Sequence, residues 1–173
     1  MNPFESGQRK VIPAVLIYPR YTTRDRDEFL MLHRNSPDRP GDYHAGKWNG
    51  LGGKLELNES PLQAAVRELH EESGLSLPSE AFRPVGVLLF PNFKAHKNED
   101  WHCTVFEAQV SERVQSAKGP EGELYWVRSS ELLELPLWPG DRYFLPRVIE
   151  RKPFLGTIWY QGQDVLKWEM TAI

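Results

Sequence analysis

The alternation of apolar and polar positions predicts strands along most of the chain. Residues 11–18 are rich in branched apolar side chains and predict a buried strand, and Pro13 near its start indicates an edge strand or a strand end. A polar turn at 19–27 separates this run from apolar residues 28–32, so the two runs predict a hairpin. Further strands are predicted in two short segments around a glycine turn within 47–57, at 82–90, 101–110 and 124–127, and in a terminal hairpin at 157–160 and 165–170.

One helix is predicted from its ends as well as from its interior. Ser60 suits the N-cap, Pro61 the first helical position, and Gln63 completes a capping box, while Gly74 suits the residue after the last turn. These signals predict a helix at 61–73. A short helix at 131–134 and a second longer one at 141–151 are also expected, with Pro146 indicating a kink or a late start.

Between the predicted strands and helices, segments rich in proline, glycine and charge predict loops at 35–46, 91–100 and 111–122. Runs of strands with one strong helix in the middle and another near the end predict an α+β fold, in which helices pack on a mixed sheet. At 173 residues the chain suits a single domain spanning 1–173.

The faces of the predicted helix 61–73 differ in chemistry. Glu68, Glu71 and Glu72 stand at i, i+3 and i+4, so their carboxylates share one face. The apolar residues that follow helical spacing lie on another face, namely Leu62, Ala65, Val66 and Leu69. Three like charges repel, and a hard divalent cation such as Mg²⁺ would compensate them. The alternative is a solvated acidic face partnered by Arg67.

A glycine-rich loop precedes this helix, with Gly50, Gly52 and Gly53 placed where backbone must approach a ligand or metal closely. The spacing from Gly53 through Glu59 to the segment 67–75 (RELHEESGL) resembles the Nudix box at each of its fixed positions. This resemblance implies the Nudix fold, an α/β/α sandwich with a mixed β-sheet and a catalytic loop, helix and loop. It also implies a metal-dependent hydrolase that acts on phosphoanhydride bonds.

The resemblance assigns roles within the box. It implies that Glu68, Glu71 and Glu72 bind Mg²⁺, which Mn²⁺ can replace, and that one of them takes a proton from the attacking water; which one stays open. Arg67 and Glu59 are expected to brace the loop and orient these ligands. Two further metal contacts follow from relatives, the Gly52 carbonyl and Glu121, for which Glu123 is the rival.

Segments outside the box resemble the branch of MutT-like enzymes that hydrolyse oxidised purine nucleoside triphosphates such as 8-oxo-dGTP. These segments are KWNGLGGK, LWPGDRYFLP and GTIWYQGQD. The resemblance implies that Asn49 reads the base, that Trp138 stacks on it with Tyr43 opposite, and that Asp141 binds its edge. The first of two acidic base-binding positions is Gly140 here, which removes one hydrogen-bond partner and puts the preference for an oxidised base in doubt.

Residues outside the motif carry alternatives. Alone, Trp138 and Tyr43 would more often be core or surface aromatics, but Trp138 beside a Pro-Gly turn and an Asp suits a stacking platform. Lys54 and Arg34 are candidates for binding phosphate, although a lone arginine at a strand end more often faces solvent. Cys103, the only cysteine, lies in a strand-like run and is expected to be structural.

Composition narrows the class of protein. The net charge of −3 gives no broad basic field, so no binding to duplex nucleic acid is expected. The longest apolar run, 14–18, is too short to span a bilayer, and residues 1–10 lack a signal-peptide core, so no membrane partner and a cytoplasmic location are expected. The oligomeric state stays open.

Three functions remain. The first is hydrolysis of a nucleoside triphosphate, purine and in particular oxidised purine, to the monophosphate and pyrophosphate, as in nucleotide pool sanitation. The second keeps the chemistry but acts on a nucleoside diphosphate sugar, ADP-ribose, a dinucleotide polyphosphate or an RNA 5′ end. The third is a nucleotide-binding module without turnover, which the complete set of box carboxylates disfavours.

Overall fold

The computed structural model describes residues 1–115 and 118–173. A ten-stranded sheet runs in the order β10-β9-β5-β6-β1-β2-β8-β7, with β3 paired to β2 and β4 paired to β1. The sheet is mixed, because β1 is parallel to β6 and β5 is parallel to β9 while the other pairs are antiparallel. The strands are β1 (Lys10–Thr22), β2 (Asp27–His33), β3 (Trp48–Asn49), β4 (Leu51–Lys54), β5 (Phe82–Lys94), β6 (Glu99–Val110), β7 (Lys118–Gly119), β8 (Gly122–Arg128), β9 (Phe154–Gln161) and β10 (Asp164–Ala172).

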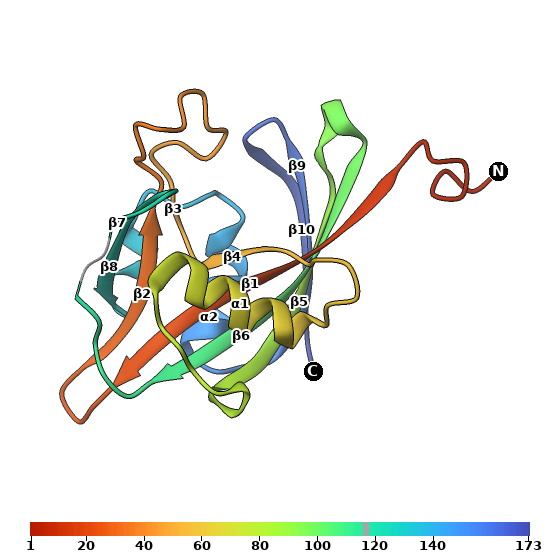
Figure 1. Ribbon diagram of the computed structural model, residues 1–173. Coiled ribbons are helices and arrows are strands. Elements are labelled where there is room, and N and C mark those ends of the chain that lie inside the picture. Colours follow the sequence, from red (N-terminus) through yellow and green to blue (C-terminus); the bar gives the residue numbers. More distant parts are fainter. Residues whose placement is uncertain (116–117) are drawn as a thin grey trace.

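Helices α1 (Pro61–Ser73) and α2 (Asp141–Ile149) cover opposite faces of this sheet (Figure 1). Each face has its own apolar core, because side chains alternate across a strand. Along β1, Val15 and Ile17 pack in the core with α1, whereas Ala14 and Tyr18 pack in the core with α2. The predicted α/β/α sandwich is therefore confirmed.

Helix α1 has the predicted bounds and the predicted caps. The Ser60 hydroxyl accepts the Gln63 N–H at 3.2 Å, and the Gln63 side chain accepts the Ser60 N–H at 2.9 Å. Gly74 closes the helix in the left-handed conformation with φ of 74°. Leu69 and Ala65 are fully buried as expected, and Ala64 joins them. One face of the helix is thus buried against the sheet, and the two caps define where the helix begins and ends.

Four predictions about strands and helices need correction. β1 is an internal strand, so the edge position proposed for Pro13 was wrong; its carbonyl accepts the Leu55 N–H at 3.0 Å near the start of the strand. Only Gly50 separates β3 from β4, because Gly52 and Gly53 lie within β4. Helix α2 begins at Asp141 with Pro146 inside it, so the late start was wrong. The segment predicted as a short helix at 131–134 is a 3₁₀ turn, Leu132–Glu134.

The predicted loop 91–100 is largely strand. β5 continues to Lys94 and β6 begins at Glu99, joined by a 3₁₀ turn at Ala95–Lys97. This hairpin projects beyond the body of the sandwich, so polar residues at its tip can face solvent (Figure 1). A short strand, β7, also lies within the predicted loop 111–122, of which residues 116–117 are outside the described part. No helix among the described residues is long and apolar enough to cross a membrane.

The N-cap of α1 gives a test of the local rule. Ser60→Ala removes the hydroxyl that accepts the Gln63 N–H, and a lost cap of this kind costs about 1 kcal/mol of unfolding free energy. The melting temperature should fall by about 2–4 °C. The matched control is Ser111→Ala, at an exposed loop serine, which should leave the melting temperature unchanged. Equal melting temperatures for both variants would contradict the cap.

Candidate active site

The carboxylates of α1 lie directly over the glycines of β4. A Cβ atom added at Gly53 would come within 3.0 Å of both carboxylate oxygens of Glu68. At the neighbouring position the Gly52 N–H donates to the Glu72 carboxylate at 3.0 Å. Glycine is therefore required here for space, since any side chain at residue 53 would expel the Glu68 carboxylate from this position.

Burial changes the acidity of these groups. Burial, opposed by the hydrogen bond from the Gly52 N–H and aided by the negative charges of Glu121 and Glu68, raises the pKa of Glu72 to about 8. Burial also raises the pKa of Glu68, opposed by Arg67. Glu121 comes from a loop before β8, so the interaction shows that the loop and the helix bring negative charge to the same place.

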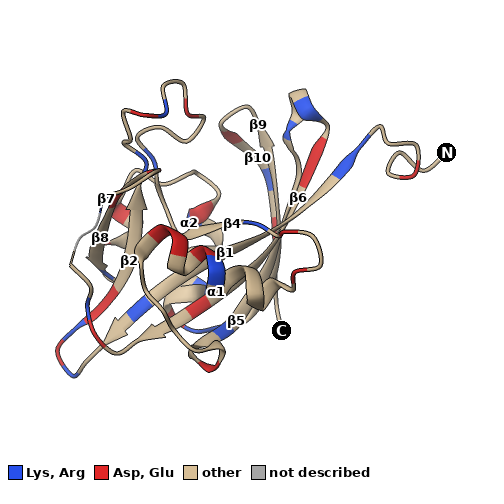
Figure 2. Cartoon of the chain, viewed as in Figure 1, with Lys and Arg blue, Asp and Glu red and all other residues tan. Residues whose placement is uncertain are grey.

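Arg67 contacts the carboxylates around the acidic face of α1, a helix on which Figure 2 shows basic and acidic segments together. Its guanidinium donates to Glu59 at 2.7 Å, to Glu68 at 2.8 Å and to Glu71 at 3.2 Å. A fourth bond, at 3.0 Å, reaches the Lys54 carbonyl at the end of β4. The hydrogen bond from Arg67 lowers the pKa of Glu59 to about 2. The expected bracing geometry is present, and so is the salt-bridged face that was the alternative.

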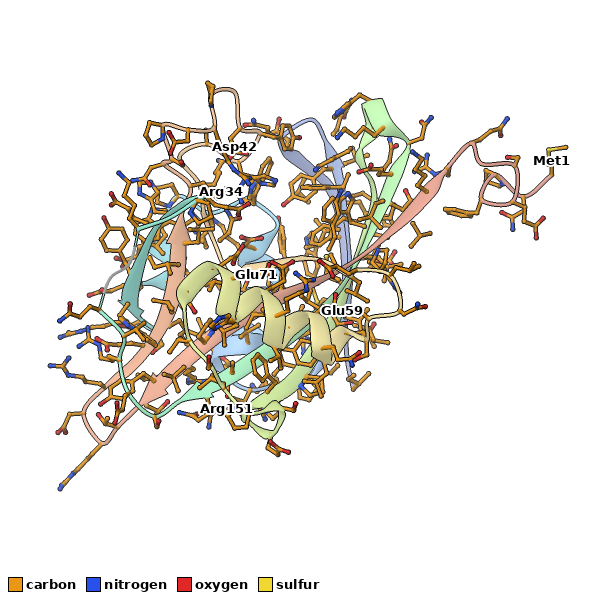
Figure 3. All side chains as sticks on the ribbon, in the orientation of Figure 1. Met1, Arg34, Asp42, Glu59, Glu71 and Arg151 are labelled. Carbon is orange, nitrogen blue, oxygen red and sulfur yellow. The ribbon has the colours of Figure 1, made fainter. Side chains whose placement is uncertain are left out.

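The donor set fits a hard divalent cation in chemistry, because it consists of carboxylate oxygens and glycine backbone. As they stand, no three acidic, histidine or cysteine side chains of the described residues converge closely enough to enclose an ion. Instead, Arg67 is ion-paired with Glu68 and Glu71, and Arg34 with Glu121. Glu71, labelled on α1 in Figure 3, is more than half exposed.

Glu121 is held by two arginines of the neighbouring loop. Arg34 lies 2.5 Å and Arg39 2.7 Å from its carboxylate oxygens. The Arg34 Nε–H also donates to Asp42 at 2.9 Å, and the two residues lie together at the base of loop 35–46 (Figure 3). Arg34 therefore does not face solvent freely. It ties the loop to the same carboxylate that lies beside α1.

A pocket of about 430 Å³ begins at this loop and runs between α2 and the projecting hairpin. Its walls include six of the residues predicted to bind substrate, and Gly52 and Glu121 of those predicted to bind metal. The six are Arg34, Tyr43, Asn49, Lys54, Trp138 and Asp141. Cys103 also contributes to the wall; it is buried, and burial raises its pKa to about 12, as expected for an inert structural cysteine.

The two predicted stacking residues meet in this pocket. The rings of Tyr43 and Trp138 lie 5.2 Å apart at 32°, which is direct aromatic contact. No base fits between two rings in contact, so Tyr43 has to move before a base can be sandwiched. Its hydroxyl donates to the Gly162 carbonyl at 3.2 Å, which links loop 35–46 to the turn between β9 and β10.

Comparisons with known proteins show the family to which the chain belongs. The NUDIX domain family matches residues 10–148, which includes α1, β4 and most of α2. The chain belongs to the Nudix family. It is 34% identical over 124 residues to an oxidized purine nucleoside triphosphate hydrolase of Danio rerio, covering 72% of this chain and 76% of that one. A mouse protein of the same name is 32% identical over the same shares.

Solved structures show the same fold. A MutT protein from Bacillus halodurans superimposes with a TM-score of 0.76 at 25% identity, covering 92% of this chain and 97% of that one. A MutT protein from Methanosarcina mazei gives a TM-score of 0.64, also at 25% identity, with coverage of 83% and 96%. The chain is therefore a Nudix hydrolase, an enzyme class that cleaves phosphoanhydride bonds.

Several pocket residues of this Nudix protein were not predicted from the sequence. His44 accepts the Trp138 Nε1–H on its Nδ1 atom at 2.9 Å, and burial lowers its pKa to about 4, so it is neutral at pH 7. Lys94, from the projecting hairpin, lies 4.6 Å from the ring of Trp101, and Lys54 lies 5.4 Å from the same ring. The two lysines of segment 94–97 (KAHK) were the available signal for a basic residue at the pocket. They could be used only once a hairpin was recognised in this segment.

Asp141 begins α2 and contributes to the wall of the pocket. Burial raises its pKa from 3.8 to about 7, opposed by the positive charges of Lys47 and Arg142. Folding therefore takes up a proton at this carboxyl between about pH 4 and pH 7. Above that window the carboxyl is charged in the folded protein, and this buried charge lowers the free energy of unfolding by at most about 4 kcal/mol.

Asp141→Asn removes this titration and tests it. The variant should gain melting temperature relative to the native protein as pH rises from 5 to 8, because only the native protein then has a buried carboxylate. Thermal unfolding at both pH values measures the difference. The control is Asp38→Asn, at an exposed loop position, whose difference from the native protein should be smaller at both pH values. A difference for Asp141→Asn that is the same at pH 5 and pH 8 would contradict the shift.

Proposed function

We propose that this Nudix hydrolase cleaves a purine nucleoside triphosphate to the nucleoside monophosphate and pyrophosphate. One observation carries the proposal: a single pocket joins the glycine strand under the α1 carboxylates to the aromatic and polar groups around Trp138. A nucleotide has the same two parts, a phosphate chain and a base, joined by a sugar. The names of the zebrafish and mouse relatives, oxidized purine nucleoside triphosphate hydrolases, support the same class of substrate.

Glu68, Glu71 and Glu72 are proposed to hold Mg²⁺, or Mn²⁺ in its place, with Glu121 and the Gly52 carbonyl beside them. The fit rests on Glu68 seated over Gly53, on the raised pKa of Glu72 and on oxygen-only donors. The cation, when bound, would neutralise phosphate charge and lower the pKa of water.

The protein's own residues have separate tasks in this proposal. Arg67 and Glu59 fix the position of the α1 carboxylates relative to β4, through bonds already present. One α1 carboxylate accepts the proton of the attacking water. Lys54 and Arg34 lie on the wall of the same pocket and supply positive charge to the phosphate chain. Trp138 and Asn49 then contact the base.

Glu71→Gln tests the proposed chemistry. The amide keeps the shape of the side chain but cannot take a proton or carry the negative charge that a cation requires. Turnover should fall by roughly 100-fold or more while the melting temperature stays within about 2 °C, because Glu71 is exposed. Glu80→Gln, at an exposed position outside α1, is the matched control and should keep full turnover. Full activity in Glu71→Gln would contradict the role of the α1 carboxylates.

A substrate panel tests the class of nucleotide. Purine nucleoside triphosphates, with and without 8-oxo substitution, should give higher kcat/KM than ADP-ribose, a nucleoside diphosphate sugar, a dinucleotide polyphosphate or a capped RNA 5′ end. Pyrophosphate, rather than orthophosphate, should be released, and EDTA should stop the reaction until Mg²⁺ is added in excess. Higher kcat/KM for a diphosphate sugar would reject the proposed substrate, and tight nucleotide binding with no product would point to a binding module.

A further inference from the structure

The absence of a side chain at residue 140 has a cause in the fold. Gly140 has φ of −68° and ψ of −25°, a backbone conformation that any residue adopts, so glycine is not required by the turn. A Cβ atom there would lie less than 3.0 Å from the Tyr160 hydroxyl oxygen, and also at 3.0 Å from Cγ2 of Ile158. The Tyr160 hydroxyl from β9 therefore fills the space that a side chain at residue 140 would take.

The hydroxyl of Tyr160 is fixed but not fully used. It accepts the Gly140 N–H at 2.8 Å, which holds its oxygen at the start of α2. The ring is held edge-on to Trp138 at 5.8 Å and to Phe93 at 5.6 Å. Within the described part of the chain, no hydrogen bond runs from this hydroxyl to a protein acceptor. Its proton is therefore available to a ligand in the pocket that Tyr160 lines.

Asp141, the residue after Gly140, supplies a hydrogen-bond acceptor to the same pocket. Asp141 lines the wall of this pocket and, when ionised above its pKa of about 7, only accepts hydrogen bonds. Its negative charge raises the pKa of the Tyr160 hydroxyl, after the larger effect of burial, so the hydroxyl keeps its proton. Above about pH 7 the wall of the pocket thus carries one O–H donor and one carboxylate acceptor.

This pair is complementary to one kind of purine edge. Guanine and hypoxanthine present a carbonyl acceptor at position 6 beside an N1–H donor, whereas adenine presents an amino donor at position 6 beside an N1 acceptor. We propose that Tyr160 is a specificity-determining residue that donates to the 6-oxo group while Asp141 accepts from N1–H. The proposal rests on the proposed function, because it assumes that a nucleotide base enters this pocket.

The proposed contacts of Tyr160 and Asp141 do not distinguish all purine bases. The 6-oxo and N1–H groups are shared by guanine and 8-oxoguanine, so Tyr160 selects 6-oxopurines over 6-aminopurines and does not distinguish an oxidised base from an unoxidised one. At residue 140 the protein has no side chain, and a hydroxyl donor from another strand lies there instead.

Binding of two matched ligands tests the role of Tyr160. Deoxyinosine and deoxyadenosine monophosphates differ only at the edge in question, and their dissociation constants can be measured by calorimetry without metal or turnover at pH 8, where Asp141 is ionised. The native protein should bind the 6-oxo nucleotide about tenfold more tightly. In Tyr160→Phe this ratio should fall to within about threefold, chiefly because the 6-oxo nucleotide binds more weakly. Tyr143→Phe, at an exposed tyrosine stacked on Trp168, should keep the native ratio.

Two results would overturn the proposal: a native protein without preference for the 6-oxo nucleotide, or equal weakening of both ligands by Tyr160→Phe. Equal weakening would show that Tyr160 only supports the start of α2. If the preference depends on Tyr160 but no nucleoside triphosphate is hydrolysed, the proposed function fails and the inference stands, so the two failures are distinguishable.

A second experiment tests the packing without any ligand. Gly140→Ala should lower the melting temperature in the native protein, because the methyl group meets the Tyr160 hydroxyl. Combined with Tyr160→Phe, which removes that oxygen, the same substitution should cost less than half as much. Strictly additive changes in melting temperature would show that Tyr160 does not occupy the space at residue 140, and would overturn the structural basis of the proposal.

Discussion

The close approach between α1 and β4 is the contact on which the candidate site depends. Glu68 lies over Gly53, Glu72 accepts the Gly52 N–H, and Arg67 reaches from the helix to the carbonyl of Lys54. A helix can come this near to a strand only where the strand has no side chains. The capping box and the buried Leu69 fix the register of α1, and so decide which of its carboxylates face the glycines.

Local patterns in the sequence predicted this part of the structure well. The bounds and caps of α1, the hairpin of β1 and β2 and the terminal hairpin are confirmed, because each depends on residues close together in the chain. The layer arrangement, which joins distant segments, followed from the resemblance to the Nudix box and is also confirmed. Grouping of the box glutamates on one face followed from helical spacing alone. The roles assigned to them remain predictions until variants are measured.

Features that depend on distant partners were not predictable in the same way. The projecting hairpin reads as a polar loop, since its apolar residues Phe93 and Trp101 are isolated among polar residues in the sequence and pack on the core only in the fold. Pairing of Tyr160 with Gly140 requires that β9 first align in parallel with β5, and no local pattern encodes that alignment. The arginines on Glu121 likewise come from a loop more than eighty residues earlier, and their ion pairs became visible only in the fold.

The parallel pairing of β5 with β9 has a consequence for how such an enzyme can change. It delivers Tyr160 to the pocket on a strand that lies outside the family match at residues 10–148, while the carboxylates come from α1 within it. The strand that carries Tyr160 can therefore acquire substitutions without altering the contacts between α1 and β4. If Tyr160 acts as proposed, one determinant of selectivity lies on a different stretch of the chain from the carboxylates, while Trp138 and Asp141 stay within the family match.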